Sequence, residues 1–97
     1  MLNNLKIKVA PHGAVSVANT GTMVLPENLR RFFAVIQNVS DTDMWITFGV
    51  QGAVGDGIKL PANGFSYEID KLNLWQGEVY AIHAAGATKV MNFVDCN

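Results

Sequence analysis

The side chains that could catalyse a reaction or bind a metal are few in this chain and lie far apart. There are two histidines, His12 and His83, and one cysteine, Cys96. His83 lies in an apolar, strand-like stretch, so we predict an ordinary half-exposed residue, and His12 follows Pro11 in a predicted turn, where we expect it to be solvated. Cys96 has no local partner that would lower the pKa of its thiol, which argues against a nucleophile. We therefore predict no catalytic residue and no enzymatic activity.

Acidic and glycine-rich turns are the next candidates for ligand binding. Asp41 and Asp43 flank a threonine, and Asp56 lies among three glycines between residues 51 and 57. Calcium needs six to eight oxygen ligands, and the spacing here matches no calcium-binding loop, so we interpret these aspartates as turn formers. The glycines resemble a phosphate-binding loop in composition, but no helix is predicted to follow them. We expect neither a metal nor a cofactor.

Three aromatic residues, Trp45, Trp75 and Tyr80, are the candidate interface residues of the regular part of the chain. Trp45 alternates with Met44 and Ile46 and so lies on the opposite face of its predicted strand. A tryptophan there could anchor a protein interface, cover the core or its rim, or form a platform for a sugar. The sequence leaves these alternatives open.

These residues lie in segments that alternate between apolar and polar side chains, the pattern of strands with one buried face. We predict that the two clearest segments, Arg30 to Val39 and Met44 to Val50, form a hairpin across residues 40–43. Other predicted strands cover Val15 to Val17, Met23 to Leu25, Ile58 to Leu60 and Phe65 to Ile69. A last hairpin is predicted from Glu78 to Ala84 and Ala87 to Val94, with Gly86 in a left-handed conformation.

Short strands at such spacing predict an all-β fold, a single small β-sandwich or jelly-roll-like domain of about seven to eight antiparallel strands. We assign residues 30–97 to the sandwich core. Residues 1–29 are a strand-forming segment that we interpret as an intersubunit arm, because Pro11, Gly13, Gly21 and Pro26 separate it from the regular strands. Within this arm, the candidate contact residues alternate with two lysines: Leu5, Ile7 and Val9.

Composition bounds the classes of partner. The 97 residues support one domain; 49% are hydrophobic and only 15% are charged, against roughly 25% in typical soluble proteins. Low charge on a small domain favours a surface that a partner covers. A net charge of −1 without a basic stripe argues against nucleic-acid binding. The longest apolar run, Phe32 to Ile36, is far too short to span a membrane.

The expected compartment follows from the start of the chain and from its cysteine content. Residues 1–4 show neither a basic nor an apolar signal-peptide region, and a single cysteine cannot form an internal disulfide. Both features fit synthesis in a reducing cytoplasm.

Several motifs follow one another from Arg30 onward. A strand that begins with arginine leads to an aliphatic residue, Gln-Asn, an acidic turn and an aromatic strand that ends in Phe-Gly. A Leu-Pro-x-x-Gly turn, an aromatic-Glu strand and a closing pair of small-residue strands come later. The segments are Arg31 to Asn38, Asp41 to Asp43, Trp45 to Gly49, Leu60 to Gly64, Tyr67-Glu68 and Gly77 to Ala84. In this pattern the chain resembles a group of small virion proteins of tailed bacteriophages; residues 1–29 fall outside it.

The resemblance implies a structural protein of the virion that is made in the cytoplasm of the host bacterium. It implies a β-sandwich present in many copies and bound to the major capsid protein or other virion proteins. We expect a capsid decoration or cement subunit that stabilises the shell, with a head-fibre, tail or connector-associated protein as the alternative. A homo-oligomer, dimer or trimer, is expected. From a different class, a small carbohydrate-binding β-sandwich module would present Trp45, Trp75 or Tyr80 as a sugar platform.

Overall fold

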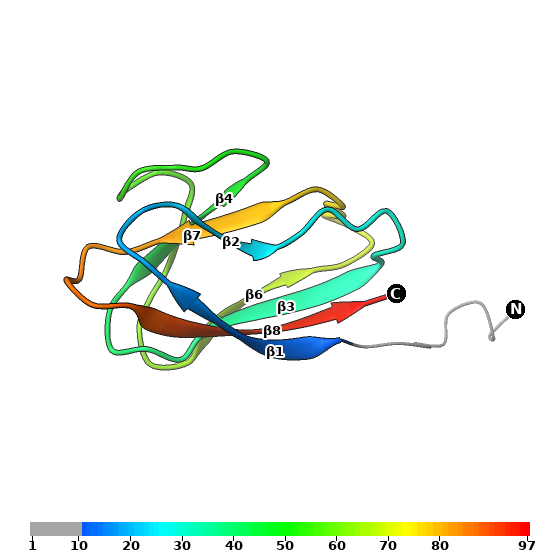
Figure 1. Ribbon diagram of the computed structural model, residues 1–97. Coiled ribbons are helices and arrows are strands. Elements are labelled where there is room, and N and C mark those ends of the chain that lie inside the picture. The colour runs from blue at the N-terminus through cyan, green and yellow to red at the C-terminus, as the bar shows by residue number, and fades with distance from the viewer. Residues whose placement is uncertain (1–10) are drawn as a thin grey trace, which may run out of the picture.

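The structure, a computed structural model, describes residues 11–97, in which the chain forms eight strands and no helix (Figure 1). The strands are β1 (His12–Val17), β2 (Thr22–Leu25), β3 (Phe33–Asn38), β4 (Met44–Phe48), β5 (Ile58–Leu60), β6 (Phe65–Ile69), β7 (Val79–Ile82) and β8 (Lys89–Cys96).

The strands form two four-stranded antiparallel sheets, which we call sheet A, with order β1-β8-β3-β6, and sheet B, with order β2-β7-β4-β5. Strands from the two halves of the chain lie side by side in the pairs β1/β8, β2/β7, β3/β6 and β4/β5. Every connection except β4–β5 passes from one sheet to the other. This is the topology of an eight-stranded jelly roll. The predicted fold class, a small all-β sandwich, is confirmed.

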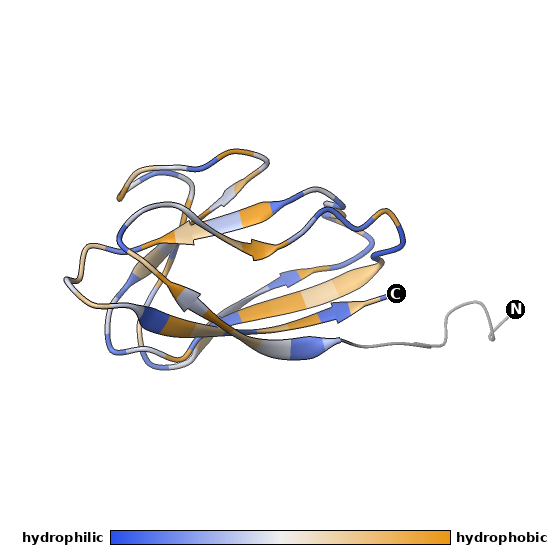
Figure 2. Ribbon diagram, in the orientation of Figure 1, coloured by the Kyte–Doolittle hydropathy of each residue, from blue (hydrophilic) through white to orange (hydrophobic). Residues whose placement is uncertain are grey.

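The core lies between the sheets because each strand turns alternate residues inward. In β3, Ala34 and Ile36 are buried between half-buried neighbours, and in β4 the buried positions Met44 and Ile46 flank Trp45. Figure 2 shows the apolar residues along β3 and β7, one strand from each sheet. The core cluster consists of Val17, Val24, Leu25, Ala34, Ile36, Met44, Ile46, Leu60, Ile69, Val79, Ala81 and Met91.

The predicted hairpin of residues 30–50 is wrong in its pairing, although both of its strands exist. β3 pairs with β6 and β8 in sheet A, whereas β4 pairs with β5 and β7 in sheet B, so residues 40–43 cross from one sheet to the other. Asn38 supplies a physical reason. Its buried amide donates to the carbonyl oxygens of Thr42, at 2.8 Å, and of Leu60 in sheet B, at 2.9 Å, which holds the crossing in place.

The predicted last hairpin is also a crossing, because β7 belongs to sheet B and β8 to sheet A. Gly86 is not among the residues with positive φ, so its expected left-handed conformation is wrong. The turn between β5 and β6 does use this conformation, at Asn63 with φ 68° and Gly64 with φ 105°. Asn-Gly tolerates positive φ, which suits this turn.

The boundary that we predicted at residues 29/30 does not separate two parts of the fold. β1 pairs with β8 over six residues, and β2 pairs with β7. Val17, Val24 and Leu25 are buried in the core cluster. Residues 12–25 therefore belong to the sandwich of this chain. The arm interpretation stays a prediction for residues 1–10, including Leu5, Ile7 and Val9, which lie outside the described residues.

Candidate functional site

His83 is fully buried, which contradicts the predicted half-exposed position. It follows Val79 and Ala81 at two-residue steps, so its ring turns inward at the end of β7. Its Nε2 lies 2.7 Å from the carbonyl oxygen of Val17, and its Nδ1 accepts a hydrogen bond from the amide of Ala85 at 3.1 Å. This pattern fits a neutral ring with the proton on Nε2. His83 joins β1 to β7 and is a structural residue of the core.

The other two candidates for chemistry lie far from His83 in the fold. His12 is exposed at the start of β1, not in the expected turn. Cys96 is buried at the end of β8. Burial and the neighbouring Asp95 carboxylate raise the pKa of the Cys96 thiol, which leaves less thiolate at neutral pH.

Each turn aspartate has a partner within the fold. Asp41 is 2.8 Å from the ammonium of Lys89, and Asp43 is 3.3 Å from that of Lys59 and also accepts from the Ala62 amide. The hydrogen bond from Lys89 lowers the pKa of Asp41, and the backbone hydrogen bond from Ala62 is the main cause of the lowered pKa of Asp43. These aspartates link the β3–β4 connection to both sheets. In residues 11–97, no three His, Cys, Asp or Glu side chains are grouped as metal ligands would be.

The glycine-rich segment forms the loop between β4 and β5. Gly57 has φ 72°, and a Cβ atom there would overlap the carbonyl oxygen of Ile46. Asp56 accepts a hydrogen bond from the amide of Ala53 in the same loop, at 2.9 Å. Glycine is required at residue 57 because the loop folds back on β4.

The part of the chain that the structure describes has no helix long and apolar enough to cross a membrane.

Two of the predicted interface residues, Trp45 and Tyr80, share the outer face of sheet B. Both alternate with core residues, and they lie on neighbouring strands, diagonally across the pairs Trp45–Ile82 and Thr47–Tyr80. The Tyr80 hydroxyl donates to Glu78 at 2.8 Å, and this hydrogen bond is the main cause of the raised pKa of Tyr80. Of the predicted site residues that the structure describes, Trp45 and Tyr80 are the two that this outer face brings together.

Trp75 lies elsewhere, at one end of the core. Its ring meets that of Phe48 edge-on, with centroids 6.0 Å apart, and Phe48 in turn lies 5.8 Å from the ring of Tyr67. The indole nitrogen donates to the carbonyl oxygen of Glu78 at 3.0 Å. With 37% of its surface exposed, Trp75 covers the rim of the core and still presents an edge to solvent.

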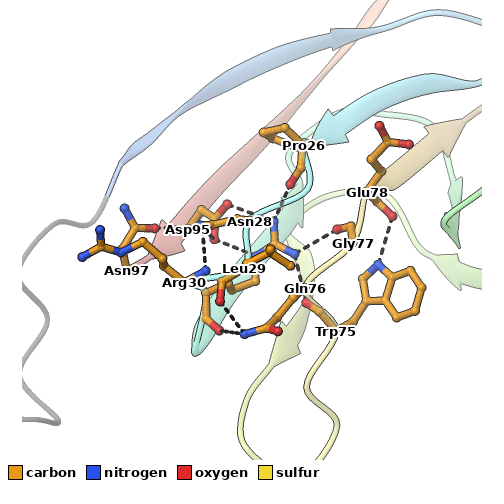
Figure 3. Close-up of polar contacts among 11 residues, drawn as sticks. Pro26, Asn28, Leu29, Arg30, Trp75, Gln76, Gly77, Glu78, Asp95 and Asn97 are labelled. Atoms are coloured by element: carbon orange, nitrogen blue, oxygen red, sulfur yellow. Dashed lines mark hydrogen bonds and ion pairs between the residues drawn. The ribbon is translucent and has the colours of Figure 1, made fainter.

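Arg31, which sequence reasoning did not single out as a site residue, binds groups at the same end of the molecule; its partners Pro26, Trp75, Gly77 and Asp95 are labelled in Figure 3. Arg31 is 1% exposed and forms a two-point ion pair with Asp95, at 2.7 and 3.0 Å. Its remaining N–H groups donate to the carbonyl oxygens of Pro26, Trp75 and Gly77, at 2.8 to 3.0 Å. All five donors of the guanidinium are satisfied, as a buried arginine requires.

Two amide side chains extend this network to the neighbouring loop. Asn28 donates to Asn97 at 2.7 Å, and its Oδ1 accepts from the Arg30 amide. Gln76 donates to the carbonyl oxygens of Leu29 and Arg31, each at 3.0 Å. Residues 26–32 and 70–78 are thus fixed to each other and to β8. No sequence signal could have identified this network, because its members are separated by more than forty residues in several cases.

We call these two loops, residues 26–32 and 70–78, the loop end. In Figure 1 both lie at the end of the sandwich where β8 and the chain terminate. The loop end exposes several large apolar side chains: Leu29 is 71% exposed, Leu72 96%, Leu74 44% and Trp75 37%. The loop end therefore has an apolar surface, and the hydrogen bonds of Arg31, Asn28 and Gln76 hold its backbone in place.

The outer face of sheet A carries a shallow, open hollow of about 490 Å³. Its lining includes the polar side chains of His12, Gln37 and Asn92. The amide of Gln37 already donates to the carbonyl oxygen of Gly64 at 2.9 Å. Among its described lining residues the aromatic rings are those of His12 and Phe93, and none of the candidate residues Trp45, Trp75 and Tyr80 takes part.

Comparisons with protein-family models, with curated proteins and with solved structures find no match to this chain. The fold defines its class, a small eight-stranded jelly roll. A relation to phage virion proteins stays a prediction from the sequence motifs described above.

Proposed function

We propose that the protein is a structural subunit of a tailed-bacteriophage virion, made in the host cytoplasm, and that it acts as a capsid decoration or cement protein. Three features support this proposal: the sequence motifs from Arg30 onward, the jelly-roll fold and the apolar loop end. Jelly rolls occur in viral capsid proteins and in lectins, so the fold is an argument by analogy. A head-fibre, tail or connector-associated position is the alternative within the same class.

The loop end is the observation that carries the proposal. Leu72 is 96% exposed and Leu29 71%, on two loops in which Arg31 binds the carbonyl oxygens of Trp75 and Pro26. Transferring such side chains from water to a partner surface is favourable by about 25 cal/mol per Å² of apolar area. A rigid loop loses little conformational entropy on binding, so more of this free energy appears as affinity. The loop end is therefore suited to dock against shell proteins.

A subunit that binds the assembled shell but not its dissociated parts stabilises the shell by mass action. Packaged DNA exerts pressure from inside, and a small subunit that bridges neighbouring capsomers would oppose their separation. Such a role needs many copies, a stable scaffold and a contact surface. Within residues 11–97, no buried side-chain nitrogen or oxygen lacks a hydrogen-bond partner, which fits a scaffold of this kind.

The test is an add-back experiment on phage particles that lack the protein. We expect wild-type protein to restore resistance to heat and chelator, and Leu72→Ser and Leu29→Ser to restore less because they remove apolar contact. Val54→Ser, at an exposed residue of the β4–β5 loop, is the matched control and should protect fully. The cementing role is wrong if particles without the protein are as resistant as complete ones. Full protection by both leucine variants would show that the loop end is not the surface that contacts the shell.

The shared outer face of Trp45 and Tyr80 favours a second candidate, the carbohydrate-binding module. Binding on a glycan array that Trp45→Ala abolishes while the variant stays folded would support this candidate over the virion role.

Homo-oligomerisation as a dimer or trimer belongs to the proposed function as well. Leu5, Ile7 and Val9 stay candidate contact residues for it, as sequence predictions about a segment outside the described residues.

A further inference from the structure

The turn between β5 and β6 contains the one place in the sequence where glycine follows asparagine, Asn63-Gly64. Asparagine is one of the chemically labile residues of proteins, because the backbone nitrogen of the next residue can attack its side-chain amide carbon. A glycine in that next position has no Cβ atom to obstruct the attack. Asn63 is also exposed, so water reaches it. This turn therefore holds the residue pair of the chain that is best suited to spontaneous deamidation.

The reaction needs no enzyme and no reagent other than water. The Gly64 nitrogen loses its proton and forms a bond to Cγ of Asn63, and the C–N bond of the side-chain amide breaks. The released nitrogen takes up the proton and departs as ammonia, which leaves a succinimide ring. Water then opens this ring at either of its two carbonyl groups. The product is aspartate or isoaspartate, in which the main chain runs through the former side chain.

The folded chain keeps the attacking nitrogen occupied. The Gly64 amide donates to the carbonyl oxygen of Asn38 at 2.7 Å. The preceding amide, that of Asn63, donates to the carbonyl oxygen of Ser40 at 2.9 Å. The carbonyl oxygen of Gly64 accepts from the Gln37 side chain, also at 2.9 Å. A backbone N–H held in such bonds gives up its proton only when the segment opens, so attack on Asn63 requires the turn to detach from the end of β3.

We propose that Asn63 is a site of covalent modification by deamidation, and that the hydrogen bonds of the β5–β6 turn restrict the reaction to molecules in which this turn has opened. An isoaspartate adds a carbon atom to the main chain immediately before Gly64, so the amide of Gly64 no longer matches the position of the Asn38 carbonyl group. The modification thus records an opening of the turn in the covalent structure. This inference goes beyond the virion role and does not depend on it.

The first test follows deamidation of the full chain at mildly alkaline pH by peptide mapping. Trypsin cleaves after Lys59 and Lys71, and the peptide between these sites, residues 60–71, contains Asn63 and no other asparagine. Deamidation replaces NH₂ by OH in this peptide and incorporates heavy oxygen from labelled water. We expect the reaction to be at least about thirtyfold slower in the folded protein than in the free peptide of the same residues, the factor that two ordinary hydrogen bonds supply.

A pair of substitutions tests whether the hydrogen bonds of the turn set the rate. Gln37→Ala removes the side-chain donor to Gly64 and should raise the rate in the folded protein about fivefold. Asn92→Ala is the matched control and should react like wild type. Asn92 is exposed and pairs with Gln37, but it lies on β8, on the opposite side of β3 from β6. Circular dichroism should show that both variants are folded.

Three results would overturn the proposal. If Asn63 reacts as fast in the folded protein as in the free peptide, the turn does not protect it. If a folded Gln37→Ala variant reacts no faster than Asn92→Ala, the hydrogen bonds of the turn do not control the reaction. If the free peptide keeps its mass while other asparagines of the unfolded chain react, Asn63 is not the site of modification.

Discussion

Removal of residues 1–25 is expected to leave a chain that does not fold. The deletion takes away β1 and β2, one edge strand from each sheet, together with the buried side chains of Val17, Val24 and Leu25. Burial of one such side chain contributes about 1.5–3 kcal/mol. Three of them together approach the total stability of a small domain, about 5–15 kcal/mol. Far-UV circular dichroism and urea unfolding should show loss of the strand signal and of cooperative unfolding.

Removal of residues 1–10 is the matched control for this truncation. All eight described strands remain in residues 11–97, so we expect a folded, cooperatively unfolding protein. Cooperative unfolding of the shorter chain, residues 26–97, would contradict the jelly-roll account and would restore the interpretation of residues 1–29 as an intersubunit arm.

Replacement of Arg31 by methionine is expected to destabilise the protein by about 3–5 kcal/mol, the range found when one partner of a buried ion pair is removed. Arg31→Met leaves the buried Asp95 carboxylate without its two-point partner. It also removes the donors to the carbonyl oxygens of Pro26, Trp75 and Gly77. The free energy of unfolding in urea measures the change.

Arg30→Met is the matched control, because Arg30 is exposed and adjacent in sequence. Its effect should stay within about 0.5 kcal/mol, as for most surface substitutions. Arg31→Lys keeps the positive charge but lacks the planar fork that holds Asp95 at two points, so it should also lose stability. An Arg31→Met variant with unchanged stability would show that the network does not hold the loop end in place.

The strands and their buried faces could be predicted from the sequence, because alternation reports directly which residues turn inward. The pairing of strands could not, since alternation is the same whether the next turn returns to the same sheet or crosses to the other. Residues 40–43 have turn chemistry that suits both outcomes. The deciding contact is the buried Asn38 amide, whose partner Leu60 lies twenty-two residues away.

The same difference applies to the candidate site residues: a position within a strand can be predicted from alternation, whereas a contact between distant segments cannot. The two-residue step from Val79 through Ala81 to His83 indicates burial of His83, and the sequence does contain this signal. Arg31 gives no such signal. Its partners come from two loops and from β8, and only the folded chain brings them together.

The position of the protein in a cryo-EM map of the phage particle that contains it tests the central proposal most directly. We predict density for the eight-stranded jelly roll at repeated positions on the capsid shell, with the loop end and its exposed Leu29 and Leu72 against shell proteins. Density for this domain in the tail alone, or a particle whose shell carries no such density, would contradict the capsid decoration role.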